Sequence, residues 1–131
     1  MWTARALPFA VIAAAVAATP ASAAVVNKFT RAGFDAAQAQ NKSILVDVKA
    51  WWCPICASQN ATIKSAVADA AYDKLVIFEV DYDEQKPDWK RFDVTKQGTL
   101  IAFRGKREIG RLAFVTDKTA INDLLAQSVR P

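Results

Sequence analysis

The pattern of apolar and polar positions switches between helical and strand periodicity along the chain. Within residues 29–40 the alanine-rich pattern has helical spacing, which predicts a first helix with Phe34 and Ala37 facing inward. The next run, residues 44–49 with the sequence ILVDVK, predicts a strand that enters the interior. The chain is therefore expected to pass from a surface helix directly into a buried strand.

A second helix is predicted to begin around Cys53. Its apolar face is marked by Ile63, Val67 and Ala70, which follow one another at spacings of four and three. Residues 75–80, with the sequence LVIFEV, are apolar enough to be a central strand of a sheet. A strand, a helix and another strand therefore follow one another here.

The second half of the chain predicts shorter elements. Residues 85–93 predict a short helix opened by Pro87, because proline suits the first turn of a helix. Residues 99–103 and 108–115 predict two strands joined by a turn at Gly105 and Lys106. This pair of strands is expected to form a hairpin.

A last helix is predicted after Thr116 or Asp117, either of which can cap it, with Ile121, Leu124 and Leu125 facing inward. The resulting order is αβαβαββα. Alternating helices and strands that end in a hairpin predict an α/β fold, a mixed sheet covered by helices on both faces.

The N-terminal residues have the character of a cleaved secretory signal peptide. Arg5 precedes an uncharged apolar stretch over residues 6–18, and Ala21-Ser22-Ala23 fits the small-residue rule for signal peptidase. The stretch is shorter than the roughly 20 residues that a membrane-spanning helix needs. A buried or anchoring helix is the alternative. We expect cleavage after Ala23 and export of residues 24–131 as one soluble domain.

Composition limits the chemistry that this domain can perform. The chain has no histidine, which excludes Ser-His-Asp and Cys-His catalysis, and its two cysteines cannot complete the ligand set of a structural zinc site. The formal net charge is +4, and its densest basic patch comprises Arg104, Lys106, Arg107 and Arg111. We interpret this patch as a solvated hairpin face and expect no nucleic-acid partner.

Both cysteines lie in the motif WWCPIC, residues 51–56, at the junction of a strand and a helix. A cysteine at a helix start is stabilised as a thiolate, because unpaired N–H groups and the helix dipole lower its pKa from about 8.5 to roughly 3.5–7.5. Pro54 fits the first helical position. Ile55 offers the thiolate no charge or hydrogen-bond donor, so we expect no strongly oxidising potential. Cys56 lies one turn after Cys53 and can attack a mixed disulfide formed there.

Three other interpretations of the cysteine pair fit the sequence less well. A structural disulfide closing so short a loop removes little unfolded-state entropy. A metal site needs ligands from outside the motif, and two free core cysteines have no reason to keep this spacing at a helix start. Redox activity is therefore the favoured interpretation.

The run LVDVKAWWCPIC, residues 45–56, resembles the active-site strand and helix of the thioredoxin superfamily. The likeness continues through residues 75–84 and 99–111 to the closing helix. The resemblance implies a thioredoxin-like fold with a mixed four- to five-stranded sheet, and thiol–disulfide exchange as the activity. It implies Cys53 as the nucleophile and Cys56 as the resolving cysteine.

The resemblance also implies a role for Asp47. This residue matches the buried aspartate that assists proton transfer at the resolving thiol; the alternative is a strand aspartate that reaches solvent. Glu79 stands where many thioredoxins have a lysine near this aspartate. Lys49, which shares a strand face with Asp47, is the candidate replacement partner.

The main departure from the thioredoxin pattern is Gly98, which stands where a cis-proline is usual before the strand that begins at Thr99. We expect a trans peptide here. In the family this loop pairs its backbone with the client, and Gly98 can instead be a turn glycine without such a role. Trp51 and Trp52 are expected to add client-contact surface beside the sulfur, although ordinary core packing would explain one of them.

Together these features predict an exported thiol–disulfide oxidoreductase that reduces periplasmic protein disulfides. We expect a monomer without a cofactor or bound metal, re-reduced by a membrane electron-carrier protein. Two alternatives remain: a Cu(I)-binding dithiol module and a redox-inactive interaction domain of the same fold. Trp52 stands where copper chaperones usually carry a methionine, which argues against the first alternative.

Overall fold

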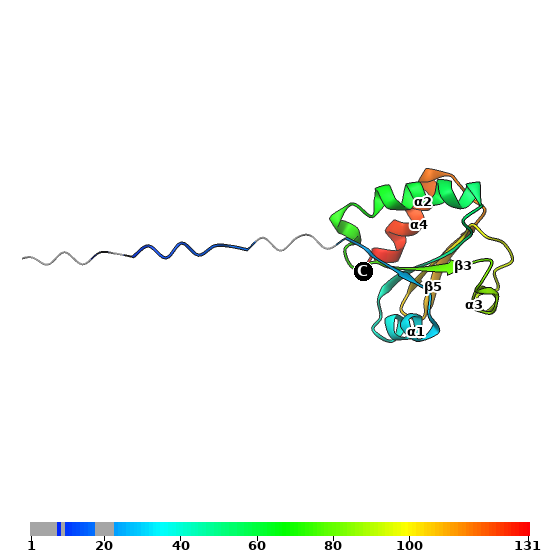
Figure 1. The fold of residues 1–131 in the computed structure, drawn as a ribbon, viewed down its shortest axis with the longest axis horizontal. Coiled ribbons are helices and arrows are strands. Elements are labelled where there is room, and N and C mark those ends of the chain that lie inside the picture. The colour runs from blue at the N-terminus through cyan, green and yellow to red at the C-terminus, as the bar shows by residue number, and fades with distance from the viewer. Residues whose placement is uncertain (1–7, 9, 18–22) are drawn as a thin grey trace, which may run out of the picture.

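The computed structural model describes residues 8, 10–17 and 23–131. Residues 25–129 hold all the helices and strands of this described part, and residues 10–17 have no regular secondary structure (Figure 1). In chain order the elements are β1 Val25–Lys28, α1 Arg31–Ala39, β2 Ser43–Lys49, α2 Pro54–Ala66, the 3₁₀ turn η1 Ala70–Tyr72, β3 Val76–Asp81, α3 Lys86–Lys90, β4 Thr99–Arg104, β5 Arg107–Ala113 and α4 Lys118–Val129.

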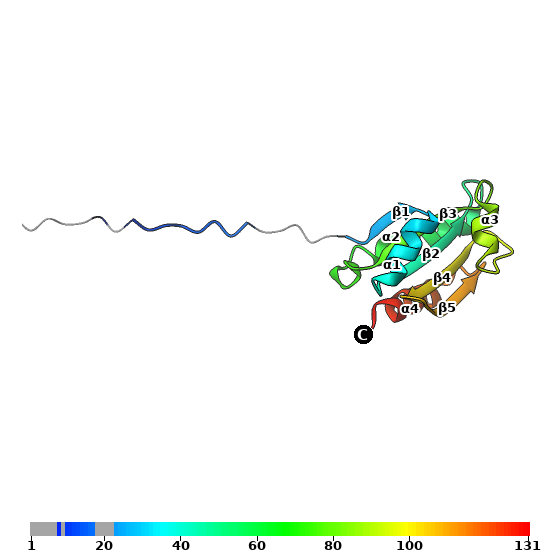
Figure 2. The same ribbon diagram turned by 90° about the horizontal axis from the view of Figure 1, so that it is seen from below.

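The strands of the described part form one five-stranded mixed sheet in the order β1-β3-β2-β4-β5 (Figure 2). β1, β3 and β2 run parallel, and β4 and β5 are antiparallel. β2 is the central strand, so its residues have neighbours on both sides: Asp47 pairs with Glu79 of β3 and with Leu100 of β4. This arrangement confirms the predicted α/β fold and gives the sheet five strands.

Helices cover both faces of the sheet, with α1 and α3 on one side and α2 and α4 on the other (Figure 1). Ile44, Val46 and Val48 of β2 face the first side, and Leu45 faces the second, as strand alternation requires. We call the α1/α3 side the aromatic face and the α2/α4 side the dithiol face. The aromatic face buries the side chains of Phe29, Phe34, Phe78, Phe92 and Phe103, and the dithiol face buries Ile63, Ile77, Leu100, Ile121, Leu124 and Leu125.

Most inward positions predicted from periodicity are buried. Phe34 and Ala37 of α1 are buried, as are Ile121, Leu124 and Leu125 of α4, whose N-cap is Asp117. Ala70 is a wrong prediction, since it is exposed in η1. The reason is that α2 ends at Ala66 and Asp69 caps the new turn, its Oδ1 accepting from Ala71 N at 2.8 Å.

Two strand boundaries also differ from the expectation. β1 was not predicted, because its four residues, VVNK, are all exposed and show no alternation of buried and exposed positions. β5 ends at Ala113 instead of Val115, because Phe114 takes a left-handed conformation with φ of 60°. β1 forms one edge of the sheet and β5 the other.

The predicted signal peptide falls mostly on residues 1–7, 9 and 18–22, which lie outside the described residues. Within residues 10–17, the apolar side chains of Val11, Ile12 and Val16 are exposed. Among the helices that the structure describes, each is too short or too polar to cross a membrane.

Candidate redox site

The site is built where the central strand β2 ends and α2 begins. The chain turns after β2 through a bond from Cys53 N to the Ala50 carbonyl at 3.2 Å, and α2 starts at Pro54. Cys53 is the N-cap of this 13-residue helix, and its Sγ accepts the backbone N–H of Cys56 at 3.1 Å. Proline suits the first turn because its missing N–H has no helical acceptor. The Cys53 sulfur therefore lies at the positive end of the helix dipole.

The two cysteines form a disulfide with their Cα atoms 5.2 Å apart. Both residues are buried, with 3% and 4% of their surfaces exposed, and they pack against Ala50, Ile55 and Tyr82. Pro54 is exposed between them. The geometry is that of an oxidised dithiol. On reduction, the N–H of Cys56 and the helix dipole stabilise negative charge on the sulfur of Cys53.

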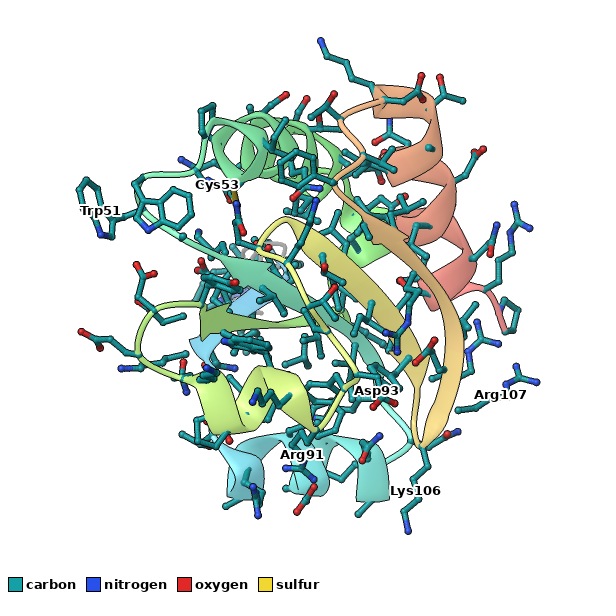
Figure 3. The ribbon with its side chains drawn as sticks, turned by 90° about the vertical axis from the view of Figure 1, so that its right-hand side faces the viewer. Trp51, Cys53, Arg91, Asp93, Lys106 and Arg107 are labelled. Carbon is teal, nitrogen blue, oxygen red and sulfur yellow. A yellow bond between two sulfur atoms is a disulfide. The ribbon has the colours of Figure 1, made fainter. Side chains whose placement is uncertain are left out.

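The two tryptophans beside the disulfide have different environments. Trp51 is 89% exposed and projects away from the domain in the loop before Cys53 (Figure 3). Trp52 is 46% exposed; its Nε1 donates to Asp83 Oδ2 at 2.9 Å, and its ring meets Tyr82 edge-on at 6.5 Å. Neither tryptophan is a core residue, so both leave apolar surface next to the disulfide.

Asp83 and Tyr82 are site residues that the sequence did not single out. They follow β3 in a short loop, where Tyr82 stacks on the Trp89 ring at 4.9 Å. Trp89 is in turn held by a bond from its Nε1 to the Tyr82 carbonyl at 2.9 Å. In the sequence, an acidic and aromatic loop of this kind is typical of a solvated strand end. Only the tertiary fold brings Asp83 and Tyr82 into contact with Trp52.

Asp47 lies on β2 and is buried, with 4% of its surface exposed. The aspartate therefore does not reach solvent, which was the alternative considered from the sequence. Burial raises the pKa of Asp47 from 3.8 to about 7; the charge of Lys49 opposes this rise, and the charge of Glu79 adds to it. A carboxyl group with this pKa can gain or lose a proton near neutral pH.

Lys49 makes its ion pair with Glu79, the residue that pairs with Asp47 across β2 and β3. Lys49 therefore interacts with two carboxyl groups. Its charge lowers the pKa of Asp47, as expected for a partner of that residue, while its ammonium group contacts Glu79. The three side chains form one charged group at the end of the parallel strands. Its net charge is set by the protonation of Asp47.

Gly98 lies next to the helix that carries the disulfide. A Cβ atom on Gly98 would be 3.2 Å from Ile55 Cγ2, and the φ of +76° is one that favours glycine. Its N–H donates to the Val48 carbonyl at 2.7 Å, which ties the loop to β2. Thr99 is buried, and its hydroxyl donates to the Lys96 carbonyl at 2.8 Å. No cis peptide bond occurs in residues 23–131, so the expected trans peptide at this loop is confirmed.

The candidate metal ligands are few. In the described part of the chain, no group of three or more Cys, Asp or Glu side chains is arranged to hold a metal ion. The arrangement that the structure brings together is therefore a disulfide, a buried carboxyl group and a loop tied to β2.

Comparison with known proteins gives consistent matches. The family model described as thioredoxin matches residues 25–127. The chain is 31% identical to the thioredoxin of Alicyclobacillus acidocaldarius over 97 residues, which cover 74% of this chain and 91% of the relative. It is 27% identical to thioredoxin-1 of Drosophila melanogaster over 92 residues, 70% of this chain and 84% of the relative.

A solved structure is similar as well. The crystal structure of Trxlp from Edwardsiella tarda superposes with a TM-score of 0.73 at 37% identity, over 76% of this chain and 97% of that chain. The family match spans both cysteines and every strand of the sheet. The chain therefore belongs to the thioredoxin family and is a thiol–disulfide oxidoreductase.

Proposed function

We propose that the protein is an exported reductant of protein disulfides, with Cys53 as the nucleophile and Cys56 as the resolving cysteine. The observation that carries this assignment is the position of Cys53 as N-cap of α2. Its sulfur receives the N–H of Cys56 and faces the positive helix end, whereas Cys56 lies inside the first turn. The donor and the helix dipole stabilise negative charge on the Cys53 sulfur, so this sulfur attacks first.

The reaction transfers two electrons from the dithiol to the client. The Cys53 thiolate attacks one sulfur of the client disulfide, forms a mixed disulfide and releases the first client thiolate. Cys56 then loses its proton and attacks the Cys53 sulfur, which releases the second client thiolate and closes the Cys53–Cys56 disulfide. The client is reduced, and the protein takes the oxidised form that the structure shows.

Asp47 is proposed to accept the proton of Cys56 during resolution. Its raised pKa, about 7, lets it be deprotonated near neutral pH and still hold a proton once it has accepted one. Because the chain has no histidine, a carboxyl group, a lysine or water must perform this transfer. Asp47 is the buried carboxyl group on the strand that leads into the motif.

The direction of electron flow is proposed from the residues around the sulfurs. Ile55 is apolar and half-buried, so it gives the Cys53 thiolate no extra donor or charge, and the reduced form is not strongly stabilised. A protein that easily gives up electrons acts as a reductant. A glutathione redox titration tests this: a reduction potential close to that of reducing thioredoxins is expected, and a strongly oxidising potential would reverse the assigned direction.

Export is proposed from residues 1–23. In the described part of that segment, residues 10–17 form no helix or strand and leave their apolar side chains unburied, as befits a leader that is not part of the domain. An exported protein cannot be reached by soluble cytosolic reductases, so a membrane electron-carrier protein is proposed as its electron donor. N-terminal sequencing of the protein from a native host is expected to begin at Ala24; an intact Met1 on protein in the cytosol would contradict export.

Trapping experiments test the assigned cysteine roles directly. In Cys56→Ala the mixed disulfide with the client cannot be resolved, so disulfide-linked adducts are expected on non-reducing gels and identified by mass spectrometry. The matched control Cys53→Ala retains only Cys56, the proposed resolving cysteine, and is expected to trap none. Equal trapping by both variants would show that the roles are not divided as proposed.

A further inference from the structure

Gln59 is a fully buried polar side chain on α2 that the redox chemistry does not use. None of its surface is exposed. Its Nε2 donates to the Gly98 carbonyl at 2.8 Å and to the Val115 carbonyl at 2.9 Å, and its Oε1 has no hydrogen-bond partner among the residues that the structure describes. Only the NH₂ end of an amide can donate to two carbonyls, so this orientation is fixed and the oxygen is left over.

The Gln59 amide connects three parts of the molecule. Gly98 lies in the loop before β4, and Val115 lies in the loop between β5 and α4. Gln59 itself is one helical turn after Cys56 on the helix that carries the disulfide. One side chain therefore ties both loops to the dithiol helix.

Three hydrogen bonds hold Gly98, and the Gln59 amide supplies one of them. The Gly98 carbonyl also accepts the N–H of Phe114 at 2.9 Å, and the Gly98 N–H donates to Val48. Both backbone polar groups of Gly98 are therefore used inside the protein. Gly98 is held from α2, from β2 and from the Phe114 loop, and its lack of a side chain lets the loop approach Ile55.

Packing alone does not explain a glutamine at this position. An apolar side chain of similar length would fill the same volume without leaving a buried oxygen unpaired, and such unpaired atoms destabilise proteins. The gain that offsets this cost is the pair of hydrogen bonds to the two loops. We propose that Gln59 is a positioning residue, which holds the Gly98 loop against α2 so that polypeptide clients bind productively to the dithiol.

This inference rests on the proposed reduction of protein disulfides and predicts a difference between two kinds of substrate. The Gly98 loop lies beside Ile55 of the CPIC motif, so a polypeptide client whose disulfide reaches Cys53 contacts this loop, and a displaced loop weakens its binding. A small disulfide such as 5,5′-dithiobis(2-nitrobenzoic acid) needs only access to the sulfur. Loss of the Gln59 amide should therefore affect the first substrate and spare the second.

The test compares Gln59→Met, which keeps the length of the side chain and removes both donors, with the wild type. Insulin reduction is measured with dithiothreitol as the reductant, and the reduced proteins are reacted with 5,5′-dithiobis(2-nitrobenzoic acid). A rise of about tenfold in KM for insulin, the size expected for the loss of one or two hydrogen bonds, with unchanged kcat and unchanged small-disulfide rate, supports the proposal. Hydrogen exchange at the Gly98 and Phe114 amides should also become faster.

Thr62→Val is the matched control. Thr62 is buried on the same helix, and its hydroxyl bonds only to the Ser58 carbonyl within α2, at 3.4 Å. This variant removes a buried polar group from α2 without touching either loop, so insulin KM and the two exchange rates should stay at their wild-type values. A rise in KM for Thr62→Val as large as that for Gln59→Met would overturn the inference.

Other outcomes separate this inference from the proposed function. Equal losses on insulin and on the small disulfide, or no change on either, would overturn the positioning role and leave the proposed function standing. A wild-type protein that reduces neither substrate would overturn both. Gln59→Leu serves as a second variant; if neither Gln59 variant unfolds cooperatively, Gln59 is a structural residue and the positioning role is wrong.

Discussion

The two faces of the central sheet bury different kinds of side chain. On the aromatic face, five phenylalanine rings contact one another with centroids 5.2 to 6.1 Å apart. On the dithiol face, aliphatic residues are joined by the buried polar side chains of Asp47, Gln59 and Thr62. Buried polar groups reduce stability unless they are satisfied, and they give a site its protonation and positioning. The aromatic face therefore contributes mainly to stability, and the dithiol face carries the chemistry.

The largest expected effect is on the aromatic face. Phe34 of α1 contacts four other phenylalanine rings. Phe34→Ala should lower the free energy of unfolding by about 4 to 5 kcal/mol, the upper part of the range for buried phenylalanine, because several rings lose a neighbour. Urea unfolding measures this loss. The folded fraction should react with a small disulfide at the wild-type rate. A slower rate would show that the aromatic face also contributes to the chemistry of the dithiol.

Asp47→Asn should have the next largest effect on the free energy of unfolding. Above neutral pH this substitution should raise that free energy, whereas Phe34→Ala lowers it. The pKa of Asp47 is about 7 in the folded protein and 3.8 ordinarily, so the folded state holds the proton more tightly. The contribution of this group to stability is therefore full below about pH 4, falls as pH rises to about 7 and stays low above it. The total change in the free energy of unfolding is about 4 kcal/mol, and the Asn side chain, which does not titrate, removes this pH dependence.

Unfolding measurements at pH 4 and pH 8 test this prediction for Asp47→Asn. The variant should be more stable than the wild type at pH 8 and about equal to it at pH 4. Reduction of insulin by the variant should be slower near pH 7, because the proton acceptor proposed for Cys56 is lost. Parallel stability profiles for the two proteins would show that Asp47 is not the group that titrates.

Gly98→Ala should cost about 1 to 2 kcal/mol of unfolding free energy. The φ of +76° disfavours any residue with a Cβ, and the new atom would be 3.2 Å from Ile55 Cγ2. Gly110→Ala is the matched control: the φ of Gly110 lies outside the left-handed region, and its Cβ would meet only the end of the flexible Leu124 side chain, at 3.1 Å. Equal costs at both positions would mean that Gly98 is not conformationally required.

Apolar and polar positions differ in how far they could be predicted from the sequence. Periodicity was enough for the apolar positions of the helices on both faces and for Cys53 at a helix start, because burial of apolar residues and helix capping are local patterns. The sequence does not predict β1, because its residues are exposed and the strand is fixed only by pairing with β3. Such an edge strand has no local signal.

Gln59 shows why the polar part of the site is harder to find. A glutamine in a helix usually faces solvent, and its partners, Gly98 and Val115, lie far along the chain. One signal was present: Cys56, Gln59 and Ile63 follow one another at spacings of three and four, which puts Gln59 on the buried face of α2. The spacing therefore predicts that Gln59 is buried, whereas its hydrogen-bond partners can be identified only from the fold.

The smallest expected effects are changes in the Asp47 pKa when the neighbouring ion pair of Lys49 and Glu79 is broken. They test whether these two residues belong to the chemistry of the dithiol face. Lys49 lowers the pKa of Asp47, and Glu79 raises it. Lys49→Met should therefore raise the Asp47 pKa above about 7, and Glu79→Gln should lower it. The two variants break the same ion pair, so a purely structural role would change stability in the same direction and leave the pKa alone. An NMR titration of the Asp47 carboxyl carbon separates these possibilities: opposite shifts of its pKa mean that the dithiol face uses Lys49 and Glu79 to adjust the proton acceptor, whereas an unchanged pKa in both variants would reduce them to a surface salt bridge.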